Sequence, residues 1–340
     1  MQINGNIYLQ KTAEDLLERF EEVLPSGMGE LASAEGISAL GIDKLISEIL
    51  SLISGGIGSA VPVFLFALGG GMLASFGTLI GSKMAGRATS MISVILSLSL
   101  LAVLYPSIKA ALGALGELSD FFGALMPVVS AIPVLGGGVS TGATASMGMQ
   151  LTLWIMGGVC GSVLPAVIAS MLATAALGDI GGVGELGRGV KSVFTKVIGI
   201  STAVLAGITA LQTFISVCAD SATMRLAKYA ASDMIPVVGG AVSGALATLA
   251  GGLSYAGGII GAGAVAAMLA IALSPLVMLL LYKLALGAAQ TVCSSISGGV
   301  SYISGLTGVL DALISAYVMT IIIYIFDIIT IISGGVGIIG

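Results

Sequence analysis

The sequence predicts an all-α, polytopic membrane protein with about six transmembrane helices and two re-entrant or broken helical hairpins that form part of an internal repeat. Of the 340 residues, 57% are hydrophobic and only 9% are charged, whereas a soluble domain carries about 25% charged residues. The mean hydropathy is +1.13. The 51 glycines suit helices that approach one another closely in lipid.

The sequence lacks the residues that several classes of function require. The chain has no histidine, which removes imidazole acid–base chemistry and most zinc sites. Cys160, Cys218 and Cys293 are isolated within or beside apolar stretches, as small buried side chains usually are. The sequence shows no phosphate-binding loop, metal cluster or nucleophile constellation. We therefore expect a protein that is not an enzyme and that uses no catalytic residue, metal, cofactor or nucleic acid.

The N-terminal segment, residues 1–54, differs from the rest of the chain. It carries nine acidic and three basic side chains, whereas the remainder carries eight acidic and nine basic ones. Thr12 with acids after it predicts a helix start, and apolar residues recur at helical spacing until Pro25. A second amphipathic stretch begins at Ile37. We predict an acidic, extracytoplasmic helical segment that contacts protein rather than anionic lipid.

Residues 55–340 form the predicted transmembrane domain. Because burying a charge in hydrocarbon costs at least about 2.5 kcal/mol, charged residues mark the ends of the spans. Five uncharged stretches, and a sixth whose one charged residue is Asp327, are long enough for a helix of about 20 residues. They lie near 57–80, 88–107, 150–176, 197–218, 257–281 and 313–332. Residues 284–310 are uncharged but rich in serine and glycine, which predicts an interfacial or packed amphipathic helix.

A nine-residue motif interrupts this pattern twice. Ile132-Pro-Val-Leu-Gly-Gly-Gly-Val-Ser140 returns 103 residues later as Ile235-Pro-Val-Val-Gly-Gly-Ala-Val-Ser243. Proline removes a helix donor, and consecutive glycines favour non-helical backbone. The apolar stretch 121–132 is also short for a span, so each motif is predicted to form a re-entrant or interrupted hairpin. The candidate hairpin residues are Pro133, Gly136, Gly137, Pro236, Gly239 and Gly240.

The same shift of 103 residues defines two repeat units, at about 88–177 and 191–282. With two membrane crossings in each unit the copies would be parallel, and with three they would be inverted. Two interpretations of the motifs remain open. The paired hairpins could line a pathway near the middle of the membrane, or proline and glycine could simply let the helices kink and pack.

Basic residues indicate the sidedness of the spans. If neither motif crosses the membrane, six basic residues share one side and three share the other, whereas one crossing gives five against four. The positive-inside rule therefore favours six spans with both termini outside the cytoplasm. The six residues predicted on the cytoplasmic side are Lys83, Arg87, Arg188, Lys191, Lys196 and Lys283.

Five charged residues are the polar site candidates. Asp327 lies within the last span, where an acid is a functional candidate by default, although a place at the interface near the C-terminus is the alternative. Asp220, Arg225 and Lys228 follow the fourth span and are interpreted as a solvated or headgroup-facing cluster. Lys283 ends a span, and its ammonium group is expected to reach toward the interface.

Two parts of the chain carry a family resemblance. One runs Asp220-Ser-Ala-Thr-Met-Arg-Leu-Ala-Lys-Tyr229 with Ile235-Pro-Val-Val-Gly239, and the other runs Leu281-Tyr-Lys-Leu-Ala285 with Gln290 downstream. They resemble the stage III sporulation protein AE family of endospore-forming bacteria. The resemblance covers most of residues 55–340 and implies a multi-pass protein of the mother-cell membrane surrounding the forespore. Its implied partners are the other stage III sporulation membrane proteins of the same complex, AA to AH, and a forespore-side partner.

Two functions follow from these observations. The resemblance implies a non-enzymatic subunit of the mother-cell-to-forespore secretion or feeding channel needed for sporulation, acting as a gate or an assembly platform. Membrane lipid and a possible homo-oligomer complete its expected contacts. The alternative is a stand-alone transporter or ion channel with a site between the two repeats. The few intramembrane charges favour the first function, because little is available to couple an ion gradient.

Overall fold

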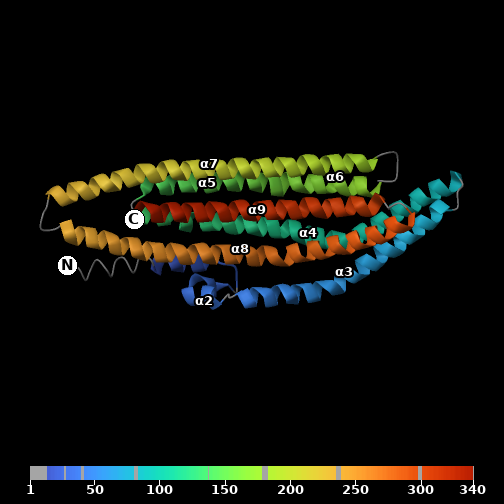
Figure 1. Cartoon of the computed structure of the whole chain (residues 1–340), viewed down its shortest axis with the longest axis horizontal. Coiled ribbons are helices and arrows are strands. Elements are labelled where there is room, and N and C mark those ends of the chain that lie inside the picture. Colours follow the sequence, from blue (N-terminus) through green and yellow to red (C-terminus); the bar gives the residue numbers. More distant parts are fainter. Residues whose placement is uncertain are drawn as a thin grey trace.

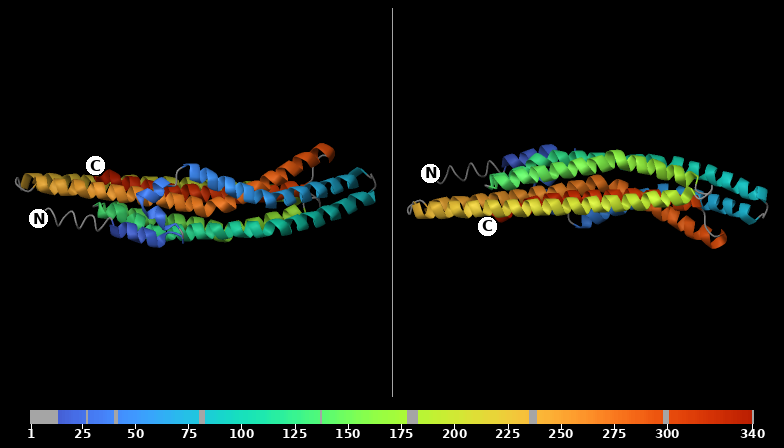
Figure 2. Two further views of the ribbon diagram at one scale, coloured as in Figure 1. Left: turned by 90° about the horizontal axis from the view of Figure 1, so that it is seen from below. Right: turned by 90° about the horizontal axis from the view of Figure 1, so that it is seen from above.

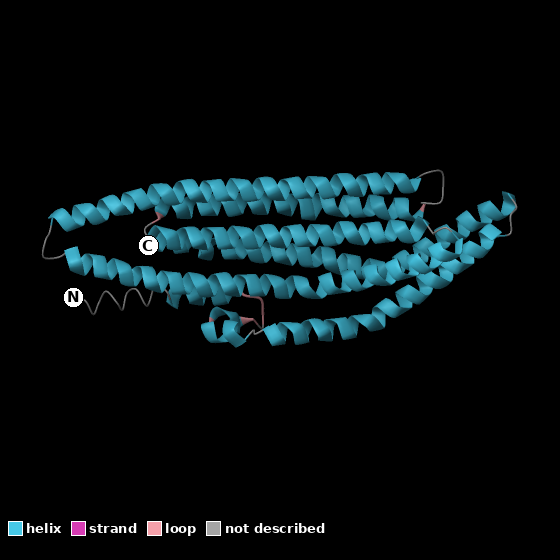
Figure 3. Ribbon diagram, viewed as in Figure 1, coloured by secondary structure: helices cyan, strands magenta, loops and turns pink. Residues whose placement is uncertain are grey.

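The computed structural model describes residues 14–26, 28–39, 42–79, 83–136, 138–177, 183–234, 239–297 and 301–339. These residues are almost entirely helical and include no strand (Figure 3). The long helices lie side by side in one elongated bundle (Figure 1). The predicted all-α polytopic class is confirmed.

The chain folds into a few long helices joined by short connections. After a helical segment at 14–23, the elements are η1 (Gly29–Ala32), α2 (Ala34–Ala39), α3 (Ile42–Leu79), α4 (Lys83–Leu135), α5 (Val139–Gly158), α6 (Leu164–Ala176), α7 (Val183–Met234), α8 (Gly239–Ser297) and α9 (Ser301–Ile339). A π-helical turn, η2 (Val159–Val163), makes α5 and α6 one continuous arm.

Six helical stretches among the described residues are long and apolar enough to cross a membrane. They are Ile46–Leu73, Met91–Leu135, Val139–Ala176, Leu186–Ala222, Tyr255–Ser295 and Tyr302–Gly334. Each overlaps one of the six predicted spans, so the predicted number is confirmed. All six stretches have 28 residues or more, whereas about 20 residues cross the hydrocarbon core.

The predicted re-entrant or broken hairpins are not confirmed. α4 is a single helix that continues through Pro127 and Pro133 to Leu135, and α5 starts at Val139 after a short turn. The apolar stretch 121–132, which is too short for a span by itself, is therefore the end of a helix of 53 residues. In the second unit α7 ends at Met234 and α8 begins at Gly239.

Each repeat unit thus consists of two long antiparallel arms, α4 with α5–α6 and α7 with α8. The turn between α4 and α5, the end of α7 and the start of α8 lie at the same end of the bundle, which we call end 1, together with the N-terminal segment and the end of α9 (Figure 1). α3, α6 and α8 finish at the opposite end, end 2. The predicted arrangement with two crossings in each unit matches this path.

Two other sequence-based boundaries fall inside helices. The expected border at residues 54 and 55 lies within α3, which is continuous from Ile42. The stretch 284–310 divides between the end of α8 and the start of α9 rather than forming a separate helix. Figure 2 shows the last part of α8, in orange, diverging from the rest of that helix. Pro275 lies inside α8, and proline is a common cause of such bends.

α9 is the central helix of the bundle. Of its apolar span, 56% is buried, compared with 17–33% for the other five. The Tyr317 hydroxyl donates a hydrogen bond to the Ala111 carbonyl oxygen over 2.6 Å. The Tyr324 ring stacks on Phe122 with a centroid separation of 4.1 Å. Large side chains from α4 and α9 therefore fill the middle of the bundle.

The N-terminal segment packs against α8. Phe20 is fully buried and Leu31 is 7% exposed. A Cβ atom on Gly263 of α8 would lie 2.5 Å from the Leu31 carbonyl oxygen and 2.8 Å from the Phe20 ring, so only glycine allows this approach. The apolar side of the segment thus contacts protein, as predicted, and its acidic residues Glu18, Glu21 and Glu22 stay exposed.

We predict that Gly263→Leu releases the N-terminal segment from α8, because the added side chain needs the space that Phe20 and Leu31 occupy. Limited proteolysis in detergent should cleave the segment about tenfold faster or more, since cleavage follows the population of the open form. Gly258→Leu is the matched control, because a Cβ atom there meets no atom within 4 Å. Equal cleavage rates for the two variants would contradict the docking.

Candidate functional site: a polar seam between α5, α7 and α9

Polar side chains gather along the interface of α5, α7 and α9. We call this set the polar seam. Its members are Thr141, Thr144, Thr152, Thr209, Gln212, Thr213, Ser216, Asp220, Thr320 and Asp327, all buried or half-buried. α5 belongs to the first repeat unit and α7 to the second, so the seam lies between the two units.

Asp220 forms the end of the seam nearest the first motif. Its Oδ2 atom accepts a hydrogen bond from the backbone N–H of Thr141 over 2.7 Å. Gly138, the N-cap residue of α5, has no side chain to cap this helix. The carboxylate of α7 therefore takes the place of a local cap, and a negative charge at a helix N-terminus is stabilising.

The same end of the seam depends on a close approach between α4 and α5. A Cβ atom on Gly142 would lie 2.1 Å from a methyl group of Val134 and 2.9 Å from the Ser130 carbonyl oxygen. Only glycine fits this position. Gly142 lies two residues beyond the first motif, and the motif comparison did not single it out.

The middle of the seam brings side-chain oxygens together. The Thr144 hydroxyl donates to Ser216 Oγ over 2.9 Å, linking α5 to α7. One turn further along α5, a Cβ atom on Gly148 would lie 3.4 Å from Gln212 Oε1 and 3.9 Å from Thr209 Oγ1. The missing side chain at Gly148 leaves these two oxygens of α7 directed at α5.

Asp327 is the acidic residue of α9 in this seam. Its side chain is fully buried, and Thr152 of α5 and Thr209 of α7 face its carboxylate. Among the described residues no contact of either carboxylate oxygen has the full geometry of a hydrogen bond, and the same holds for Thr152 Oγ1 and Gln212 Oε1. The Asp327 side chain is therefore enclosed by protein on the inner side of α9.

Beyond Asp327 the seam closes toward end 2. Cys160 Sγ lies 3.4 Å from Thr320 Oγ1, and the Thr320 hydroxyl also donates to the Ala316 carbonyl oxygen. Thr320 and Asp327 are seven residues apart on α9, so they face the same side of that helix. Unpartnered oxygens thus occur between Asp327 and end 1, whereas the neighbouring pair toward end 2 is satisfied.

A second polar cluster lies nearer end 2. The ammonium groups of Lys191 on α7 and Lys283 on α8 both pair with the Asp311 carboxylate on α9. The Lys283 Nζ–Asp311 Oδ1 distance is 2.7 Å. Lys283 therefore contacts protein rather than reaching only toward the interface. Sequence analysis did not select Asp311, because nothing local marks it as the partner of lysines 28 and 120 residues away.

α4 carries charges at the depth of the neighbouring span. Ser107 Oγ lies 3.4 Å from the Tyr282 hydroxyl, and Ile132 lies beside Gly257. These contacts place residues 107–132 of α4 along the predicted span 257–281 of α8. Three charged residues fall in this part of α4 and are exposed: Lys109, Glu117 and Asp120. The helix itself does not end at Lys109 but continues to Leu135.

We call this surface the α4 charged face. Gly113 and Gly116 lie between its charged residues, and a Cβ atom on either would meet nothing within 4 Å. Residues three or four apart on a helix share one side, so small and charged residues alternate along an open strip. Lipid does not suit such a strip, because ionised carboxylates in hydrocarbon are costly.

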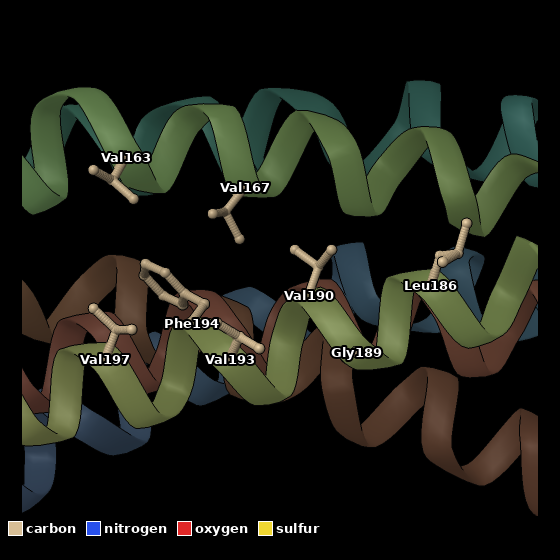
Figure 4. Close-up of a pocket in the computed structure, with 8 residues that line it drawn as sticks. All are labelled: Val163, Val167, Leu186, Gly189, Val190, Val193, Phe194 and Val197. Atoms are coloured by element: carbon tan, nitrogen blue, oxygen red, sulfur yellow. The ribbon is translucent and has the colours of Figure 1, made fainter.

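An apolar groove of about 490 Å³ lies between α6 and α7. In Figure 4 the side chains of Val163 and Val167 face Val190 and Phe194 across it. Leu186, Gly189, Val193 and Val197 complete the lining. None of these side chains bears a group that could hold a polar ligand or act in a reaction.

The predicted motif residues do not meet as a pair of hairpins. Pro133 is buried at the end of α4, and Gly136 is half-buried in the turn that follows. Gly239 and Gly240 open α8. Gly137 and Pro236 lie outside the described residues, and the side chains of Arg225 and Lys228 in α7 are also outside them. What the structure brings together is Asp220, the first motif and Asp327, along one interface.

The fold and the seam define the class: this is a multi-pass helical membrane protein whose polar residues are concentrated between buried helix faces. The family model of stage III sporulation protein AE matches residues 24–335. The chain therefore belongs to the stage III sporulation protein AE family, as the sequence resemblance indicated, and is a sporulation protein. No curated protein and no solved structure matches the chain.

We predict that Asp220→Ala loosens the start of α5, because Gly138 supplies no side chain to replace the lost acceptor. Losing a helix cap costs about 1 kcal/mol. Hydrogen–deuterium exchange at the Thr141 amide should accelerate about fivefold if that cost appears as local opening. Ser140→Ala is the control within the same turn, because the Ser140 side chain is exposed. Unchanged exchange in the Asp220 variant would contradict the capping role.

We predict that Asp311→Asn destabilises the bundle, because it leaves two ammonium groups near one another without their common partner. The three side chains are 28–45% exposed, so we expect a loss of about 1–3 kcal/mol, between the values for exposed and buried pairs. Equilibrium unfolding in detergent would measure it. Lys196→Gln, an exposed site on the same helix as Lys191, should change stability much less.

Proposed function

We propose that this protein is a non-enzymatic membrane subunit of the mother-cell-to-forespore secretion or feeding channel, and that it acts as an assembly platform or gate. The α4 charged face carries the proposal. An exposed strip with Lys109, Glu117 and Asp120 lies beside a span of α8, where lipid would be an unfavourable neighbour. A protein partner or a water-filled conduit would be a favourable one.

The centre of the bundle supports a route outside this chain rather than through it. Tyr317 and Tyr324 are fully buried, and their contacts with Ala111 and Phe122 fill the space between α4 and α9. A channel in which this subunit takes part would therefore run along its surface. The α4 charged face is the surface suited to water.

Long helices with apolar outer faces also support assembly. α4 has 53 residues, a length of about 80 Å at 1.5 Å per residue, compared with a hydrocarbon core of about 30 Å. Large apolar side chains are exposed at its end 1 as well, including Val134 and Leu135. These surfaces suit contacts with the family's AA to AH proteins, with a forespore-side partner or with further copies of the chain.

We further propose that the protein resides in the mother-cell membrane surrounding the forespore, with end 1 outside the cytoplasm. The basic residues predicted on the cytoplasmic side include Lys83, which begins α4, and Arg188 and Lys191, which lie within the first three turns of α7 toward end 2. The positive-inside rule then orients end 2 to the cytoplasm. The acidic N-terminal segment would lie in the space between the two membranes.

One observation favours the alternative, a stand-alone transporter or ion channel with a site between the repeats. Asp327 faces Thr152 of the first unit and Thr209 of the second. Flux measurements separate the two functions. Purified protein in liposomes should give no selective, saturable ion or solute flux if it is a platform or gate that needs partners, and such flux would favour the alternative.

Thiol accessibility in membranes of sporulating cells tests the proposed function. With exposed Cys218 replaced by serine, we predict that Gly113→Cys and Gly116→Cys react with a small membrane-impermeant thiol reagent, because this face borders water when assembled. Phe214→Cys on α7 is the control, since Phe214 is 68% exposed on an apolar helix face and lipid should protect it.

Deleting the partner proteins should change the labelling rate at Gly116→Cys by several-fold or more, since partners bound the conduit or cover the face. The Phe214→Cys rate should stay the same. If both α4 cysteines are as inert as Phe214→Cys, with and without the partners, the α4 charged face borders lipid and the proposal fails.

A further inference from the structure

Four buried oxygen atoms around Asp327 in the polar seam make no contact with full hydrogen-bond geometry in the described part of the chain. They belong to Asp327, which contributes both carboxylate oxygens, and to Thr152 and Gln212. Thr209, 3% exposed, adds a hydroxyl beside them. Buried polar atoms in native structures are almost always satisfied, so this local group requires an explanation.

We propose that Asp327, Thr152 and Thr209, with Gln212 beside them, form a binding site for one monovalent alkali cation such as Na⁺. The side chains come from three helices and converge from both repeat units onto α9. A cation among them would contact an anionic oxygen and neutral hydroxyl and amide oxygens, which are the hard ligands that such ions prefer. The site is independent of the proposed channel role.

The charge of the group sets the valence of the ion. Asp327 is the only carboxylate in the group, and no cluster of three or more His, Cys, Asp or Glu residues occurs among the described residues. A monovalent ion would neutralise this single charge. A divalent ion would leave a net positive charge buried in an apolar bundle, which is costly.

Close approach without full hydrogen-bond geometry distinguishes this group from an ordinary hydrogen-bonded cluster. Thr152 and Thr209 lie close enough to interact with the carboxylate, yet no contact of the two carboxylate oxygens has the full geometry of a hydrogen bond. In the same seam Thr144 does pair with Ser216 over 2.9 Å. Oxygens that lie close together without pairing keep lone pairs available to an ion.

Polar atoms continue from the site toward end 1. Between Asp327 and Asp220, which is 8% exposed, lie Gln212 Oε1 and one further unpaired oxygen, Thr141 Oγ1. Gly148 lies beside Gln212 and adds no side chain there. Toward end 2, Thr320 and Cys160 contact each other and continue the seam without an unpaired oxygen. The unpaired oxygens of the seam therefore lie at the site and on its side toward end 1.

Equilibrium binding of radioactive Na⁺ to the purified protein in detergent tests the proposal. We expect saturable binding of about one ion per chain that is displaced by excess unlabelled Na⁺. Asp327→Asn, which keeps the side-chain shape, should abolish it. Thr152→Val, which replaces the hydroxyl with a methyl group, should weaken binding about tenfold, as expected for a lost ligand oxygen.

Thr202→Val is the matched control. Thr202 is also a buried threonine of α7, but its hydroxyl already donates to the Ile198 carbonyl oxygen, so Na⁺ binding should not change. Unfolding midpoints of all variants are measured with choline as the only cation, to show that each folds. Absence of Na⁺ binding to folded wild-type protein would overturn the proposal and leave Asp327 as a protonated, neutral side chain. Binding that survives Asp327→Asn would overturn it as well.

Discussion

The enclosure of α9 by other helices is the constraint on which the rest of the structure depends. Tyr317, Thr320, Tyr324 and Asp327 follow one another at intervals of three and four residues, the spacing that keeps side chains on the buried side of a helix. Because all four are polar and fully buried, the neighbouring helices have to supply the contacts that their polar groups and rings need. α4 accepts the tyrosines through Ala111, Phe122 and Ser119. α5, η2 and α7 surround Thr320 and Asp327.

This arrangement divides the polar residues of the protein into two separate groups. The seam lies inside the bundle, between α5, α7 and α9, and most of its side chains are buried. The α4 charged face lies on the outside, beyond the tyrosines that fill the centre. One group is therefore enclosed within a single chain, whereas the other is accessible to neighbouring molecules.

The fold class, the number of spans and the family followed from composition, charge spacing and short motifs, because lipid requires uncharged helices of a minimum length. The re-entrant hairpins predicted from the two motifs are not confirmed. Pro133 lies two residues before the end of α4. The length of the apolar stretch 121–132 could not show whether Pro133 ends a long helix or interrupts a short one. Asp311 and Gly142 were missed because their roles depend on helices far away in sequence. Asp327 could be selected, but its neighbours Thr152 and Thr209 carry no local signal.

The shift of 103 residues that relates the two predicted repeat units also relates the two polar groups. It places Lys109, Gly113 and Glu117 of α4 on Gln212, Ser216 and Asp220 of α7, which are seam residues. In α7 this face is covered by α5, whereas in α4 the equivalent face is exposed. The fold therefore buries only one of two faces at equivalent positions. Since α9 lies outside both units and supplies Asp327, only the buried face lies in the same interface as that carboxylate. On α7 only Asp220 of these three residues is charged, whereas α4 carries both Lys109 and Glu117. The exposed face is thus the more highly charged of the two, and lipid is the less favourable neighbour for it.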